Sequence, residues 1–65
     1  MNLQINQQTF TLPDAATLAD ALAAYGAKPP FAAAVNGAFV ARGRYAQYGL
    51  HAEDRIDVVQ PVAGG

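Results

Sequence analysis

The sequence predicts an α+β domain in which one main helix packs on one face of a mixed sheet of four to five strands. Two observations lead to this prediction: two pairs of short apolar segments, each pair joined by a polar turn, and one amphipathic segment between the pairs. With 65 residues the chain should form a single small domain. Because such a domain buries only about 60% of the surface of its unfolded chain, each large apolar side chain should have a defined place.

The first predicted hairpin occupies the N-terminal part of the chain. Residues 3–6 and 9–12 alternate apolar and polar side chains, which is the period of a strand buried on one face. A short polar link, Asn-Gln-Gln, joins the two segments, so they should pair as antiparallel strands. The core face of this hairpin should carry Leu3, Ile5, Phe10 and Leu12.

The predicted helix follows this hairpin. Thr17 is a suitable N-cap because its hydroxyl can accept a hydrogen bond from an unpaired backbone N–H, and Asp20 completes a capping-box pattern. Gly26 is a typical C-terminal stop, and Pro29-Pro30 prevents continuation. A helix of about eight or nine residues is too short to be stable alone in water, so it should pack on the sheet. Its apolar stripe consists of Leu18, Ala21, Leu22 and Tyr25.

A second hairpin is predicted after the two prolines. Residues 31–35 and 38–41 read as its strands, the first mainly from its position in the chain. Asn36-Gly37 between them is a strong signal for a tight turn, because both residue types tolerate positive φ. We assign this pair no role beyond the turn.

The remainder of the chain should contain one more strand. A turn or short helix is predicted around residues 44–47, and the last strand over residues 56–60. Pro61 ends this strand because proline cannot donate to a sheet ladder. The chain should therefore consist of a folded domain over residues 1–60 and a flexible C-terminal tail over residues 61–65 that ends in Gly-Gly.

Composition excludes several classes of function. The chain has no cysteine, so it can form no disulfide or cysteine-based zinc site, and it has no thiol nucleophile of its own. His51 is the only histidine, without carboxylates clustered at ligand spacing, so we expect no metal site. The sequence offers no nucleophile–base pair, acidic dyad or phosphate loop. We therefore expect no catalytic residue and no enzyme acting alone.

Charge and hydropathy bound the location and the partners. The formal net charge is −1, and the four cations form no basic patch for nucleic acid or anionic lipid. The N-terminus lacks the pattern of a signal peptide, and no apolar run is long enough to span a bilayer. We expect a soluble, cytoplasmic protein with no nucleic-acid partner and no membrane partner.

Five segments, taken together and in order, carry a resemblance to a known family: Leu3–Asn6, Thr17–Leu22, Ala34–Gly37 with Val40 and Arg42, Glu53–Ile56, and Val62–Gly65. They resemble the ThiS group of sulfur-carrier proteins of thiamine biosynthesis, which have the ubiquitin-like β-grasp fold. The resemblance covers the full length. The chain departs from the group at Glu53-Asp54, where Gly-Asp is usual, and at Ala41, where proline is frequent. Both departures concern turns and leave the tail unchanged.

The resemblance implies a carrier rather than an enzyme. An adenylyltransferase of the E1-like type, using its own ATP and Mg²⁺, would adenylate the Gly65 carboxylate. A sulfur donor system, supplied indirectly by a cysteine desulfurase, would convert the adenylate to a thiocarboxylate (1-thioglycine at Gly65). A thiazole synthase would then receive the sulfur for the thiazole ring of thiamine. No cofactor would be bound permanently.

The tail residues suit delivery of a terminal carboxylate. Gly64 and Gly65 lack Cβ, so they can pass a narrow channel and adopt backbone angles closed to other residues. Fully extended, residues 61–65 reach roughly 17 Å at about 3.3–3.6 Å per residue. Val62 and Ala63 should give the tail apolar contacts that fix its register in the partner.

Two residues outside the tail are candidates for contact with a partner. Residues of both parities are apolar in the segment Ile56–Val59, and only one face of the strand can lie in the core. Val59 should therefore lie on an exposed apolar patch that a partner covers. Arg42 is a possible anchor for an acidic partner surface, and the alternative is an ordinary solvated charge.

Other functions fit the same tail. A carrier with another client, such as the small subunit of molybdopterin synthase, would use the same chemistry, although those chains tend to be longer. A ubiquitin-like modifier would be joined through Gly65 to target lysines. A binding module with an incidental Gly-Gly end is a third alternative.

Overall fold

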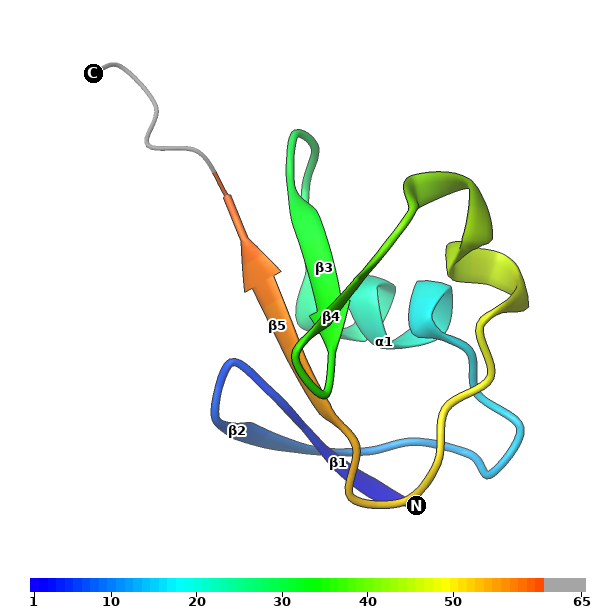
Figure 1. The fold of residues 1–65 in the computed structure, drawn as a ribbon. Helices are drawn as coiled ribbons and strands as arrows, with labels where there is room; N and C mark the ends of the chain where they lie inside the picture. Colours follow the sequence, from blue (N-terminus) through cyan, green and yellow to red (C-terminus); the bar gives the residue numbers. More distant parts are fainter. Residues whose placement is uncertain (61–65) are drawn as a thin grey trace.

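The computed structural model describes residues 1–60 and contains a five-stranded mixed sheet with one α-helix (Figure 1). The fold class predicted from the sequence, a β-grasp domain, is confirmed. The predictions for the tail lie outside the described residues. In chain order the elements are β1 (Asn2–Ile5), β2 (Gln8–Thr11), α1 (Leu18–Tyr25), β3 (Ala32–Val35), β4 (Ala38–Val40), the 3₁₀-helix η1 (Arg42–Gln47) and β5 (Arg55–Val59).

The last strand lies in the centre of the sheet, whose order is β2-β1-β5-β3-β4. Strand β5 is parallel to β1 and antiparallel to β3, and each of these neighbours forms a hairpin with an edge strand. Both hairpins have two-residue turns, Asn6-Gln7 and Asn36-Gly37, with φ between 49° and 87° at all four residues. Positive φ at both positions matches the right-handed twist of the flanking strands. The chain thus reaches residue 60 from the middle of the sheet, between the two hairpins (Figure 1).

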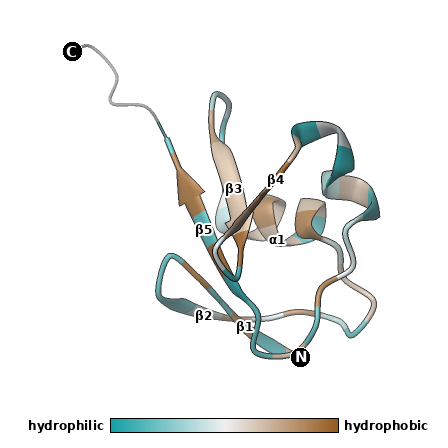
Figure 2. Ribbon diagram, viewed as in Figure 1, coloured by the Kyte–Doolittle hydropathy of each residue, from teal (hydrophilic) through white to brown (hydrophobic). Residues whose placement is uncertain are grey.

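The core lies between α1 and one face of the sheet. Figure 2 shows hydrophobic residues along α1 and at the end of β5, and mostly hydrophilic residues on η1. Phe10 and Leu12 were predicted in the core but are only half-buried, because β2 is an edge strand with no neighbour on its outer side. The buried cluster consists of Leu3, Ile5, Leu18, Ala21, Leu22, Ala33, Val35, Leu50, Ile56 and Val58.

The helix has the predicted caps. The Thr17 hydroxyl accepts a hydrogen bond from the Asp20 N–H (3.3 Å), and the Asp20 carboxylate accepts one from the Thr17 N–H (2.9 Å). Together they form the reciprocal capping box. Gly26 ends the helix with φ 85°, and its N–H donates to carbonyls of the last turn. Tyr25 is half-buried and packs edge-to-face on Phe10 of β2, with ring centroids 6.1 Å apart.

The second half of the chain differs from prediction only at its element ends. Helix η1 begins two residues earlier than predicted, and β5 runs from Arg55 to Val59 rather than from residue 56 to residue 60. The Tyr45 ring of η1 stacks on Phe31 with centroids 5.9 Å apart, and this contact joins η1 to the start of β3. Tyr45 and Tyr48 both pack against the core as half-buried side chains.

Candidate functional site

The candidate site is where β5 ends and the tail begins. Residues Val62, Ala63, Gly64 and Gly65, predicted to carry and deliver the reacting carboxylate, lie outside the described residues. Val59 is the last residue of β5, the central strand. Arg42 is exposed at the start of η1, directly after the edge strand β4. The structure therefore places the two predicted contact residues on different elements.

A side-chain amide holds the end of β5. Strand β1 stops at Ile5, but the Asn6 N–H still donates to the Ile56 carbonyl (2.9 Å). The next ladder bond would run from the Val58 N–H to the Asn6 carbonyl, and instead this N–H donates to Asn6 Oδ1 (2.8 Å). Asn6 Nδ2 donates in turn to the Val58 carbonyl (3.2 Å). The side chain thus continues the β1–β5 ladder after the main chain has turned away.

Asn36 does the same at the start of β5. Its N–H donates to the Arg55 carbonyl (2.7 Å), and the Arg55 N–H donates to Asn36 Oδ1 (3.0 Å) rather than to the Asn36 carbonyl. Asn36 Nδ2 donates to the buried Asp54 carboxylate (3.0 Å), which also accepts from the His51 N–H (2.8 Å). The prediction that Asn36-Gly37 has no role beyond the turn was wrong. The positive φ turns the main chain out of the ladder, and the amide oxygen replaces the lost carbonyl.

Sequence reasoning missed both asparagines as ligands of β5. Asn6 and Val58 are 52 residues apart, and Asn36 and Arg55 are 19 apart, so no local pattern relates them. The available signal was asparagine at the first position of a two-residue turn, in a hairpin whose inner strand pairs with the last strand. That signal requires the strand order, which the residues alone do not give.

The open face of the sheet has an apolar half. The side chains of Phe39 (71% exposed) and Val59 (54% exposed) are the large hydrophobic residues most open to solvent within residues 1–60. They are opposite Ala34 and Ala32, respectively, so all four side chains lie on the face turned away from α1. We call these four residues the apolar patch. The predicted exposure of Val59 is confirmed, and its contact with a partner stays a prediction.

The other half of the open face is polar. Strands β1 and β2 present Gln4 and Thr9 there, which are opposite each other in the register. Arg55 of β5 is paired with Gln4, and Asp57 follows on the same face. The apolar patch is therefore confined to β3, β4 and the end of β5.

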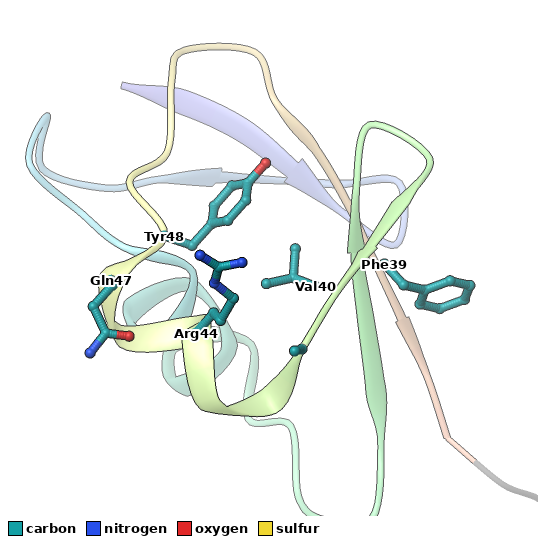
Figure 3. Close-up of a pocket in the computed structure, with 6 residues that line it drawn as sticks. Phe39, Val40, Arg44, Gln47 and Tyr48 are labelled. Atoms are coloured by element: carbon teal, nitrogen blue, oxygen red, sulfur yellow. The ribbon is translucent and has the colours of Figure 1, made fainter.

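A shallow groove of about 540 Å³ lies between β4 and η1 (Figure 3). The Arg44 and Tyr48 side chains extend toward Val40, while Phe39 points away from them to the other side of β4 (Figure 3). Strand β3 separates this groove from β5 in the sheet. The groove is therefore distinct from the end of β5, and Phe39 belongs to the apolar patch.

The described residues hold few charged interactions. Within residues 1–60 the single ion pair joins the Met1 ammonium to Asp14 (3.2 Å). Over the same residues no group of three or more acidic or histidine side chains has the arrangement of a metal site. No helix in this range is both long and apolar enough to cross a membrane.

Comparison with known proteins assigns the chain to a family. The model of the ThiS family matches residues 2–65, which includes the tail. The chain belongs to the ThiS family. Its fold is similar to the crystal structure of a thiamine biosynthesis protein (ThiS) from Geobacter metallireducens, with a TM-score of 0.81 and 19% sequence identity over 100% of both chains. A search of curated protein sequences finds no match. The predicted resemblance to the ThiS group is confirmed.

Proposed function

We propose that this ThiS-family chain is a sulfur carrier of thiamine biosynthesis and acts as a co-substrate of partner enzymes. The observation that supports this most is the family match through residue 65, on a fold whose central strand leads directly into the Gly-Gly tail. The Gly65 carboxylate is the group activated, and the tail residues Val62, Ala63 and Gly64 deliver it. The client is a thiazole synthase.

The chemistry requires activation by a partner. A carboxylate is a poor electrophile because its charge repels nucleophiles and oxide is a poor leaving group. Attack of the Gly65 carboxylate on the α-phosphate of ATP forms an acyl-adenylate and releases pyrophosphate, with Mg²⁺ and cationic groups of an E1-like adenylyltransferase stabilising the charge. A sulfur nucleophile then displaces AMP. Since the chain has no cysteine, this sulfur comes from another protein, supplied by a cysteine desulfurase.

The apolar patch is the surface we propose for docking the adenylyltransferase. It is exposed without being needed for the core, and Val59 is two residues before Pro61, where the tail begins. A partner that covers Phe39 and Val59 would hold the body of the carrier beside the channel that takes up the tail. Arg42, exposed beyond β4, would pair with acidic groups at the rim of this interface.

A direct test is activation of Gly65. The chain is incubated with its adenylyltransferase, ATP and Mg²⁺, and chain-dependent pyrophosphate release is measured. Gly65→Val should reduce release to the background rate, because a branched side chain cannot follow the path of glycine. The matched control is Gly43→Val in η1, where an added Cβ meets nothing within 4 Å, and it should be activated normally. Normal activation of Gly65→Val would contradict the proposal.

The same experiment separates the alternatives. A ubiquitin-like modifier would also be adenylated, but would then appear in conjugates with lysines of other proteins. A carrier for molybdopterin synthase would form the thiocarboxylate and fail to support thiazole formation by a thiazole synthase. A binding module would show no pyrophosphate release.

A further inference from the structure

The end of β5 would be held on only one side without Asn6. On the β3 side, Val58 and Val59 are opposite Ala33 and Ala32. On the β1 side, pairing of main chains ends at Ile5, opposite Ile56. The residues that connect the sheet to the tail therefore depend on a single side chain for their second support.

Asn6 uses its whole amide group for this support. Oδ1 accepts from the Val58 N–H (2.8 Å), while Nδ2 donates to the Val58 carbonyl (3.2 Å) and to Tyr25 Oη (2.9 Å). This arrangement needs one acceptor and two donors. An amide has them, whereas a carboxylate would place negative charge against the Val58 carbonyl. Asparagine also accepts the left-handed φ of 49° at this turn position.

Tyr25 connects this clamp to the helix. Its hydroxyl accepts from Asn6, and its ring packs edge-to-face on Phe10, next to the hairpin turn. The last turn of α1, the β1–β2 turn and the end of β5 are therefore joined at one side chain. At the same end of the sheet, Gln60 Nε2 donates to the Lys28 carbonyl (3.0 Å), just after the helix.

We propose that Asn6 is a positioning residue for activation of the tail: it fixes the position and direction of Val58, from which residues 61–65 are delivered. This inference rests on the proposed function. A displacement at Val58 is carried along the chain to the Gly65 carboxylate, and a misplacement of about 1 Å at a reacting group can cost on the order of 100-fold in rate. Docking through the apolar patch does not involve the Asn6 amide, so binding is separable from positioning.

Asn36 provides a matched control at the other end of the same strand. Both asparagines have left-handed φ (49° and 51°), and both replace a main-chain carbonyl in a β5 ladder with their side-chain oxygen. Glycine tolerates this φ, so Asn6→Gly and Asn36→Gly each remove an amide without straining the turn. The two variants lose similar hydrogen bonds, and only the first loss is next to the tail.

The experiment measures pyrophosphate release as a function of carrier concentration, at a temperature where every variant is folded. Asn6→Gly should lower kcat about 10- to 100-fold with KM changed less than about twofold. Asn36→Gly should leave both parameters unchanged, although each variant lowers Tm by roughly 4–8 °C. Tyr25→Phe, which removes one hydrogen bond and keeps the ring, should give an intermediate loss of kcat. Amide exchange should accelerate at Val58 in Asn6→Gly and at Arg55 in Asn36→Gly.

Equal kcat values for Asn6→Gly, Asn36→Gly and the unsubstituted chain would overturn the inference and leave the proposed function intact. An equal fall of kcat in both glycine variants would also overturn it, because that result indicates general loosening of β5. If Asn6→Gly does not fold, the kcat of Tyr25→Phe decides the question, and an unchanged value refutes the inference. Absence of activation in the unsubstituted chain would overturn the proposed function itself.

Discussion

The two faces of the sheet differ in what their apolar residues do. On the face covered by α1, Ile56 and Val58 of β5 are buried in the core cluster. On the open face of the same strand, Val59 is 54% exposed, and Phe39 of β4 is 71% exposed. Since successive side chains of a strand point to opposite faces, one short strand contributes to both surfaces. The covered face determines stability, and the apolar half of the open face is available for recognition.

The largest effect on stability is expected on the covered face. Ile56 is 1% exposed, and Ile56→Ala should destabilise the domain by about 2–5 kcal/mol through lost burial and the cavity left behind. A domain this small has little reserve, so much of that variant should be unfolded at 25 °C. Ile56→Val should cost about 0.5–1.5 kcal/mol and remain measurable by urea unfolding. Equal unfolding midpoints for Ile56→Ala and the unsubstituted chain would contradict this assignment of the core.

A substitution on the apolar patch should separate binding from stability. Val59→Asp should weaken affinity for the adenylyltransferase about tenfold or more, because it places a charge at the centre of the proposed interface. Its unfolding free energy should change by less than about 1 kcal/mol, since the side chain is exposed. The control is Thr9→Asp, which introduces the same charge on the polar half of the open face. Unchanged affinity in a folded Val59→Asp variant would remove the patch from the interface.

The smallest effect is expected at the cap of the covering helix. Thr17→Ala should destabilise the domain by about 1 kcal/mol, because it removes the acceptor for the Asp20 N–H. Affinity for the partner should not change, since the cap belongs to the covered side. Thermal unfolding and a binding titration on the same sample check both statements. A loss of affinity without a loss of stability would mean that α1 itself contacts the partner.

Most of the fold was predictable because its signals are local. Alternation gave the β1–β2 hairpin, the spacing of Leu18, Ala21 and Leu22 gave the helix, and Asn36-Gly37 gave the second turn. The exposure of Val59 followed from parity, since two apolar residues in succession cannot both face one core. The half-burial of Phe10 did not follow, because it depends on β2 being an edge strand.

The supports of β5 were not predictable for a different reason. The amide of Asn6 reaches Val58, and that of Asn36 reaches Arg55, only in the register that the assembled sheet provides. Asparagine in a turn is fully explained by the turn itself, so the sequence gives no sign of a second role. Such side-chain ligands of a distant strand become visible only with the strand order.

The central claim is that Gly65 carries sulfur as a thiocarboxylate. The most direct measurement is the intact mass of the protein from cells that contain its native partners, followed by the mass of its C-terminal fragment. The account predicts a population heavier by the difference between one sulfur and one oxygen, with the change at Gly65. A C-terminal fragment that stays a carboxylate while the cells make thiamine through this chain, or that appears only joined to lysines, would contradict it.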